Sequence, residues 1–304
     1  MAIANTGGSN KLNLSYKRSK REMDKQEIQE LEKIAAKIRW HTVHSIFSAG
    51  SGHPGGALSI ADILATLYFD IMKINPLQPK WSERDRLVLS KGHAAPSYYA
   101  ALALRGYFPV DDMVTLRNFD SYLQGHPDMK KIPGVDMSTG SLGQGLSVAN
   151  GMALVSKFDG SGFRVFAMLG DGEIEEGQIW EAAMTASHYK LGNLTAFLDC
   201  NGLQIDGKVT DVMSPLPLKE KFQAFGWAVT EIDGHSIEAI KNAADWAQTI
   251  PEQPKLIICR TIKGKGVSFM ENQAGWHGAA PNQEQWQVAQ NELNQVLLSL
   301  GVKQ

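Results

Sequence analysis

Two polar residues in this sequence, Asp171 and Asn201, each follow a hydrophobic run. Asp171 stands between two glycines, and Asn201 follows the run 194–199. If the two runs are neighbouring parallel strands, both side chains lie at the carboxyl edge of the sheet, where open α/β sheets bind ligands. Taken singly, either residue is also a common turn residue. Together they favour a Mg²⁺ site that holds a diphosphate, with the Leu203 carbonyl as a third protein ligand.

Histidines provide the second chemical signal. Four of the eight lie in glycine-flanked loops: His53, His93, His126 and His277. None has the i, i+4 spacing of a helical zinc pair, so proton transfer or anion binding is favoured over a metal cage. The other four receive no functional role: His41, His44 and His188 fall in helical segments, and His235 lies in a loop without a visible partner.

A glycine-rich loop at 138–145 opens a predicted helix, which is an arrangement that holds phosphate. Three glutamates begin another predicted helix after Gly172: Glu173, Glu175 and Glu176. Acidic residues at such a position complement the helix dipole, and this effect explains the presence of Glu173 and Glu175 without a functional role. Lys263 and Lys265 follow a predicted strand and either neutralise phosphate or form a solvated basic turn.

The elements that must position these residues alternate between strands and helices. We expect strands at 86–90, 163–169, 194–199, 228–232 and 255–261. We expect helices at 26–48, at 60–69 with Ser59 as its cap, through 100–104, and at 146–157, 179–188, 219–225, 237–248 and 284–300. This order predicts an α/β fold, a parallel sheet with helices on both faces. No linker interrupts it, so residues 25–304 are expected to form one domain.

Composition adds several exclusions. The chain has 304 residues, is 43% hydrophobic and carries a formal charge of −2, which indicates no nucleic-acid partner. No apolar run approaches membrane-spanning length, and the first ten residues lack a secretory core, so we expect a cytoplasmic protein without a membrane partner. The polar and basic residues 1–24 are expected to be a flexible tail or a leader. Cys200 and Cys259 are expected to be free thiols.

Several catalytic motifs are absent from the sequence. It contains no phosphate-binding Gly-x-x-x-x-Gly-Lys-Ser/Thr loop, no dinucleotide fingerprint after a strand, no His-Glu-x-x-His and no serine in a nucleophile elbow. These absences favour a cofactor that carries the chemistry itself.

Five motifs, in this order, resemble those of transketolases. They are Ser51-Gly52-His53-Pro54-Gly55, Leu89-Ser90-Lys91-Gly92-His93, Thr139-Gly140-Ser141-Leu142-Gly143-Gln144-Gly145, Ile205-Asp206-Gly207 and His277-Gly278-Ala279. Gly170-Asp171-Gly172 followed by Asn201 resembles the wider thiamine diphosphate signature. The resemblance covers roughly residues 26–285 and implies a thiamine diphosphate-binding fold, here the domain that holds the diphosphate.

The resemblance also implies roles for individual residues. Asp171, Asn201 and the Leu203 carbonyl match ligands of Mg²⁺, with Ca²⁺ or Mn²⁺ as alternatives. Gly170, Gly172 and His93 match the diphosphate site, while Gly140, Ser141 and Leu142 match the loop beside the thiazolium and aminopyrimidine rings. His53, His126 and His277 match histidines that face the substrate hydroxyls or the cofactor. Glu176 matches a glutamate that links the two active sites of a dimer.

Length is the departure from the family pattern. Common transketolases are about twice as long and add a pyrimidine-binding domain that nothing here matches. The resemblance therefore implies the N-terminal subunit of a split transketolase, which transfers a two-carbon ketol unit between sugar phosphates together with a C-terminal subunit, as an α2β2 heterotetramer. The alternatives are the α subunit of a 2-oxoacid dehydrogenase, a non-catalytic diphosphate-binding subunit, or an excised domain. The histidine loops speak against the first.

Overall fold

A five-stranded parallel sheet forms the centre of the protein. The computed structural model describes residues 25–302, so the tail predicted for residues 1–24 lies outside the described residues. The strands are β1 (Arg86–Leu89), β2 (Val165–Gly170), β3 (Leu194–Cys200), β6 (Ala228–Asp233) and β7 (Lys255–Arg260), in the order β1-β2-β3-β7-β6. Every pairing in this sheet is parallel. The five predicted strands are therefore confirmed, within one or two residues at their ends.

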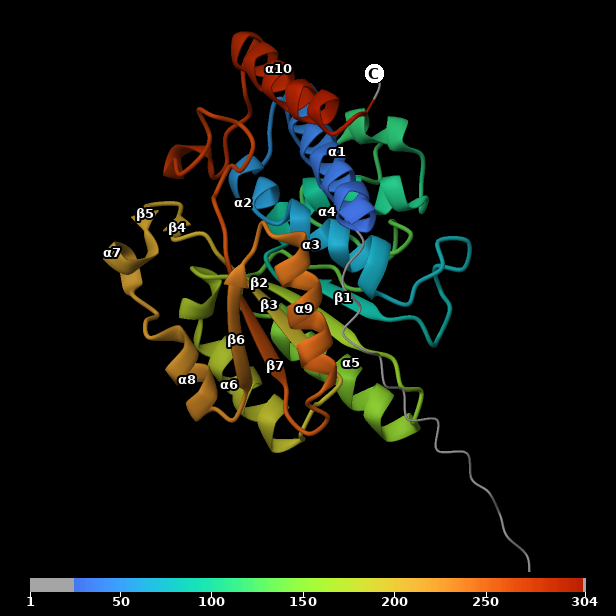
Figure 1. Ribbon diagram of the computed structural model, residues 1–304, viewed down its shortest axis with the longest axis vertical. Helices are drawn as coiled ribbons and strands as arrows, with labels where there is room; N and C mark the ends of the chain where they lie inside the picture. Colours follow the sequence, from blue (N-terminus) through green and yellow to red (C-terminus); the bar gives the residue numbers. More distant parts are fainter. Residues whose placement is uncertain (1–24, 303–304) are drawn as a thin grey trace, which may run out of the picture.

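Helices cover both faces of the sheet, as predicted (Figure 1). One face packs on α1 (Lys25–Ala49), α3 (Ala61–Thr66), α4 (Ala95–Arg105) and α9 (Ile237–Gln248). The opposite face packs on α5 (Gly145–Asp159), α6 (Gly177–His188) and α8 (Leu218–Ala224). Successive residues of each strand alternate between the two cores: Leu87 and Leu89 enter the first, and Val88 enters the second.

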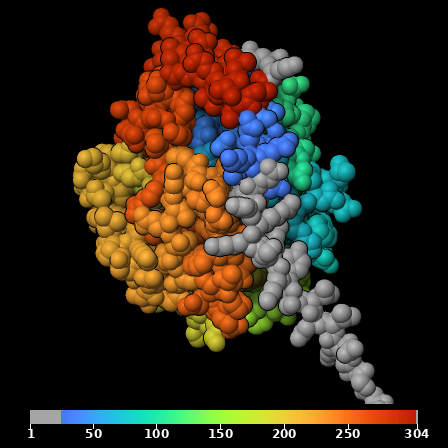
Figure 2. All heavy atoms as spheres, in the orientation of Figure 1, coloured from blue at the N-terminus to red at the C-terminus, as the bar shows by residue number. Residues whose placement is uncertain are grey.

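A smaller core lies where α10 (Gln283–Ser299) packs on α1. It contains Val43, Val267 and Trp286, and the ring of Phe47 stacks on that of Trp286 at 5.3 Å. In Figure 2, α10 lies directly against α1 at one end of the molecule. A capping box between Asn282 and Gln285 begins α10, one residue before the predicted start at 284.

The segment after the first histidine loop folds differently from the prediction. Instead of one helix at 60–69, it forms α2 (Pro54–Leu58), α3 and the π-helical turn η1 (Leu67–Ile71). Ser59 does not cap a helix N-terminus: it ends α2, and its hydroxyl donates to the Gly56 carbonyl and to Asp199. Pro54 at the first helical position starts α2 earlier than the apolar pattern indicated.

The remaining elements are short and were not expected from periodicity. They are the β4–β5 hairpin (Leu203–Gln204 and Gly207–Lys208), α7 (Val209–Met213) and the 3-10 turns η2 (Gly92–Ala94), η3 (Val110–Thr115), η4 (Glu173–Glu175) and η5 (Ala274–Trp276). Figure 1 shows the hairpin and α7 together at one side of the molecule. Cys200 and Cys259 are free thiols, as expected. Among residues 25–302, no helix has the length and apolarity needed to cross a membrane.

Candidate active site

The ends of β2 and β3 place Asp171 and Asn201 at the same edge of the sheet. Gly170 is paired with Asp199, so the residues that follow each strand emerge side by side. Asp171 Oδ1 accepts the Gly172 amide at 3.0 Å, and its Oδ2 accepts the Gly202 amide at 2.6 Å. The carboxyl-edge arrangement predicted from the two hydrophobic runs is therefore present.

The environment of Asp171 suits a bound cation. Burial raises the pKa of this carboxyl to about 6, and the nearby charge of Asp199 adds to the increase. A divalent cation would offset both effects, because it favours the ionised carboxylate. The Asn201 amide oxygen and the Leu203 carbonyl complete the proposed oxygen set. Within residues 25–302, no group of three or more histidine, cysteine, aspartate and glutamate side chains could form an alternative metal site.

A cavity of about 210 Å³ lies directly beside these oxygens. Several residues with an expected cofactor role line it: His93, Leu142, Gly170, Asp171, Gly172, Asn201, Leu203 and His277. Lys91 and Lys263 also line the wall, so two positive charges face a space next to open glycine backbone. An anion with several oxygens fits this composition, because both lysines and the glycine amides favour negative charge.

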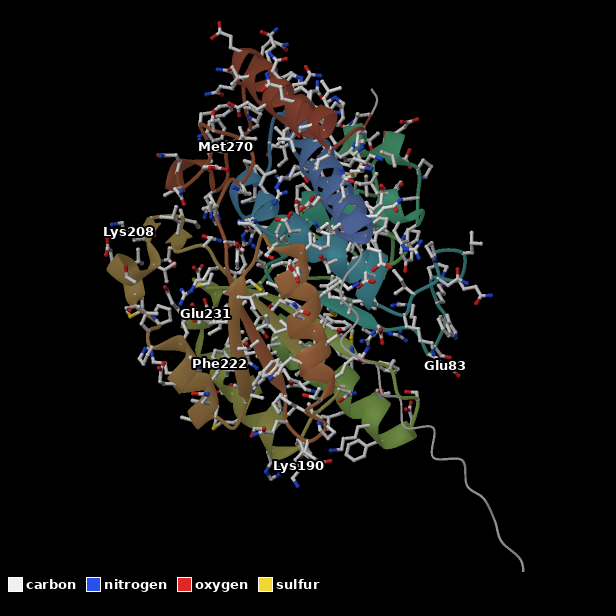
Figure 3. The ribbon with its side chains drawn as sticks, in the orientation of Figure 1. Glu83, Lys190, Lys208, Phe222, Glu231 and Met270 are labelled. Atoms are coloured by element: carbon white, nitrogen blue, oxygen red, sulfur yellow. The ribbon has the colours of Figure 1, made fainter. Side chains whose placement is uncertain are left out.

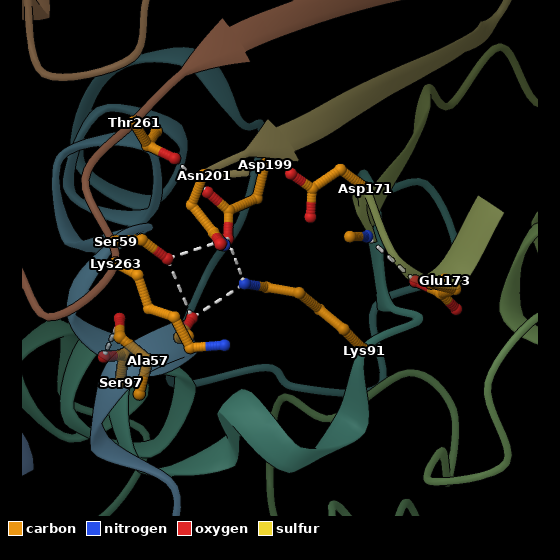
Figure 4. Close-up of polar contacts among 12 residues, drawn as sticks. Ala57, Ser59, Lys91, Ser97, Asp171, Glu173, Asp199, Asn201, Thr261 and Lys263 are labelled. Carbon is orange, nitrogen blue, oxygen red and sulfur yellow. Dashed lines mark hydrogen bonds and ion pairs between the residues drawn. The ribbon is translucent and has the colours of Figure 1, made fainter. Parts of the chain in front are cut away.

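Lys91, which lines the cavity, forms a buried ion pair with Asp199 (Figure 4). Lys91 Nζ donates to Asp199 Oδ2 and, at 2.7 Å, to the Gly56 carbonyl. Although burial acts to raise the pKa of Asp199, the Lys91 charge and the surrounding hydrogen bonds hold it below its usual value. The Asn201 amide nitrogen donates to Asp199 Oδ2 at 2.8 Å. Asp199 thereby fixes which end of the Asn201 amide carries the oxygen.

The four loop histidines, which come from distant parts of the sequence, gather in one cluster. The His53 ring lies 5.4 Å from His93, 5.5 Å from His277 and 6.4 Å from His126. Burial lowers the pKa of His53 and of His277 to about 4, and the neighbouring positive charges add to this. Burial also lowers the pKa of His93 and His126. At neutral pH these rings are uncharged and can accept protons.

Lys263 connects the histidine cluster with the proposed metal ligands. Its Nζ lies 3.0 Å from His277 Nδ1 and 3.1 Å from the Leu203 carbonyl. Burial lowers the pKa of Lys263 to about 8, and the charge of Lys91 contributes, so the amine is still protonated at pH 7. Nδ1 of His277 must then accept, which leaves the ring proton on Nε2. Lys263 is a buried site residue and does not form a solvated basic turn.

The glycine-rich loop contributes Leu142 to the cavity wall. A Cβ on Gly140 would approach His126 Cδ2 to 3.0 Å, so the loop packs against the histidine cluster. Leu142 is 37% exposed and lines the cavity, whereas Ser141 is exposed and does not. Glu176 also lies outside the cavity wall: it is exposed at the start of α6, against Gly143.

Sequence reasoning missed the roles of two further residues. Glu173, interpreted as a helix-dipole residue, is 3% exposed and accepts hydrogen bonds from the amides of Gly143 and Gly170. His235, which showed no partner in the sequence, lies with Nδ1 2.7 Å from Asp62 Oδ2 and accepts the Ile262 amide on Nε2. Apart from Gly170, these partners lie at least 27 positions away in the chain, so no local pattern could indicate them.

Comparison with known proteins identifies the family. The family model described as "Transketolase, thiamine diphosphate binding domain" matches residues 31–295. The chain is 48% identical to the 6-deoxy-6-sulfo-D-fructose transketolase subunit of Clostridium sp. (strain MSTE9), over 89% of this chain and 98% of that subunit. It is 41% identical to one of the subunits of apulose-4-phosphate transketolase from Phocaeicola vulgatus, over 88% of this chain and 95% of that protein.

Longer relatives match over part of their length. Human transketolase is 42% identical over 84% of this chain, but the match spans 40% of the human protein. The crystal structure of Campylobacter jejuni transketolase superposes with a TM-score of 0.82 and 31% identity, over 91% of this chain and 46% of that one. The chain belongs to the transketolase family. The part that it represents is the domain that binds thiamine diphosphate in that family.

Proposed function

We propose that this chain binds the diphosphate of thiamine diphosphate through a divalent cation, and that it forms half of a transketolase active site. The observation that carries the proposal is the meeting of Asp171, Asn201 and the Leu203 carbonyl beside a cavity lined by two lysines. These three oxygens would hold Mg²⁺, with Ca²⁺ or Mn²⁺ as alternatives. Gly170, Gly172 and His93 would face the diphosphate, and Lys91 and Lys263 would offset its charge.

Bound thiamine diphosphate supplies the nucleophilic carbon that cleaves and transfers a two-carbon ketol unit. The residues of this chain would bind and orient the reactants around it. Gly140, Ser141 and Leu142 would lie beside the cofactor rings. His53 and His126 would accept and return protons of substrate hydroxyls, since their uncharged rings have free acceptor capacity. His277 would instead donate from its ring N–H, because its one acceptor nitrogen is taken. His277 Nδ1 is occupied by Lys263, so its Nε2 would contact the substrate or cofactor.

We further propose that the chain is the N-terminal subunit of a split transketolase and acts with a C-terminal subunit that carries the pyrimidine-binding domain. Two relatives that are named as subunits are covered over 98% and 95% of their length, which supports this assignment. An α2β2 heterotetramer, in which Glu176 connects paired sites, follows from the same proposal. Membership of the transketolase family does not favour a 2-oxoacid dehydrogenase or a non-catalytic subunit.

Sugar phosphates are the proposed substrates. The names of two relatives refer to 6-deoxy-6-sulfo-D-fructose and apulose 4-phosphate, so a donor panel should include these sugars besides fructose 6-phosphate and xylulose 5-phosphate. Residues 25–304 as one domain and a cytoplasmic location stay predictions of the sequence.

Calorimetry tests the cofactor site directly. The wild-type chain should bind thiamine diphosphate in the presence of Mg²⁺ and lose this binding when EDTA replaces the metal. Asp171→Ala removes the buried carboxylate and should abolish the metal-dependent binding. Unaltered affinity in Asp171→Ala would show that the cation site lies elsewhere.

A further inference from the structure

Glu173 lies in the wall of the proposed cofactor cavity, at a point where three separate segments meet. One of its carboxylate oxygens accepts the Gly143 amide at 3.0 Å and the Ser90 hydroxyl. The other accepts the Gly170 amide at 3.0 Å. Ser90 follows β1, Gly170 ends β2, and Gly143 belongs to the glycine-rich loop. One buried carboxylate therefore ties that loop to the ends of two strands.

The loop has few other polar connections. Within residues 25–302, the bond from the Gly143 amide to Glu173 is the only hydrogen bond made by residues 139–143. The Thr139 hydroxyl is buried and has no partner there. Packing supplies the remaining restraint: a Cβ on Gly92 would lie 2.7 Å from the Thr139 carbonyl carbon, so the backbones touch. The position of residues 140–142 consequently depends on a single hydrogen bond and on close packing.

The chemistry of the acceptor matters at this position. All three groups that face Glu173 donate, and an ionised carboxylate is the side chain that only accepts. A glutamine of the same size would turn its NH₂ group toward at least one of the donors. The backbone amide or hydroxyl on that side would then have no acceptor.

We propose that Glu173 is a positioning residue that holds the Gly140–Leu142 loop in register with the Asp171–Gly172 edge. The proposal rests on the function assigned above, in which the loop faces the cofactor rings and the edge faces the diphosphate. Loss of Glu173 should therefore weaken binding of whole thiamine diphosphate more than binding of inorganic diphosphate. Asp171, in contrast, should affect both ligands equally.

The test combines amide hydrogen exchange with calorimetry on the full chain. The variant is Glu173→Gln, and the matched control is Asp85→Asn. Asp85 is also a buried carboxylate that accepts two backbone amides, those of Lys73 and Arg164, but it lies at the opposite end of β1 from the site. Melting curves of both variants report any general loss of stability.

In Glu173→Gln, the amide hydrogens of the peptide 138–145 should exchange roughly tenfold faster than in the wild type, as expected for one lost hydrogen bond to a charged acceptor. The affinity for Mg²⁺–thiamine diphosphate should fall by roughly tenfold, with inorganic diphosphate and Mg²⁺ changed by less than roughly threefold. Asp85→Asn should leave the exchange of this peptide and both affinities unchanged. Exchange in Glu173→Gln that equals the wild type overturns the positioning role.

The remaining outcomes separate the two proposals. Equal losses for thiamine diphosphate and inorganic diphosphate in Glu173→Gln would overturn the positioning role, since the carboxylate would then act on the diphosphate edge. Faster amide exchange in Glu173→Gln together with an unchanged affinity for thiamine diphosphate would also overturn the positioning role. If the wild-type chain binds neither thiamine diphosphate nor inorganic diphosphate, the proposed function is contradicted. Faster amide exchange of the peptide 138–145 in Glu173→Gln would still support the restraint of the loop by Glu173.

Discussion

Removal of Lys91 should destabilise the fold strongly, because its partner Asp199 would remain buried. The two side chains are 2% and 0% exposed, and they form an ion pair beneath the cavity. Truncating one partner of a buried pair costs about 3–5 kcal/mol. Asp199 also accepts from Ser59 at 2.7 Å and from the Asn201 amide at 2.8 Å. These bonds persist in Lys91→Met, so we expect about 3 kcal/mol, the lower end of that range.

Urea denaturation of the full chain measures this cost as a change in the free energy of unfolding. Glu252→Gln serves as the control, since its pair with Lys190 is 3.7 Å long with both side chains more than half exposed. Lys190 lies at the end of the molecule far from α10 (Figure 3). The control should change stability by less than about 0.5 kcal/mol. A loss below about 1 kcal/mol in Lys91→Met would refute the reasoning about the uncompensated charge.

Two further predictions concern packing and pH. Gly192→Ala should destabilise the protein by about 3 kcal/mol, because its Cβ would lie 1.7 Å from the Pro251 carbonyl oxygen. Gly151→Ala, in an open position of α5, should instead stabilise it by about 0.5–1 kcal/mol. Unfolding midpoints in urea that equal the wild-type midpoint would contradict both predictions. Acidification from pH 6.5 toward 4 should lower the free energy of unfolding through His53 and His277, since their pKa is about 4 in the folded chain and 6.5 without the fold. In that window the unfolded chain binds the additional protons, so the double variant with asparagine at both positions should lose less stability than the wild type.

The architecture could be predicted because its signals are local. Five hydrophobic runs ended in turn residues, and the helices between them showed apolar positions at helical spacing, so the parallel sheet and its two helical layers followed. The β4–β5 hairpin could not be found this way, because each strand has only two residues. The break between α2 and α3 was missed because the segment is buried on all sides, which leaves no amphipathic pattern to read.

The residues of the candidate site also differ in whether local sequence signals indicate them. Asp171, Asn201 and the histidine loops have glycine neighbours or strand ends as local signals. The structure places Asp171, Asn201, His93 and His277 around one cavity, and His53 and His126 beside those histidines rather than on the cavity wall. Lys91 and Glu173 are buried polar residues whose partners lie up to 108 positions away in the chain. Their spacing to those partners is set by the fold, so sequence position alone gave Lys91 no separate role and gave Glu173 only a dipole-related one.

Reconstitution of activity tests whether this chain forms half of a transketolase active site. The purified chain is assayed for ketol transfer from the donor panel, alone and together with a candidate C-terminal subunit that carries a pyrimidine-binding domain, in the presence of thiamine diphosphate and Mg²⁺. We expect negligible turnover by the chain alone, turnover with the partner, and loss of that turnover in His53→Ala. Robust turnover by the rigorously purified single chain would contradict it.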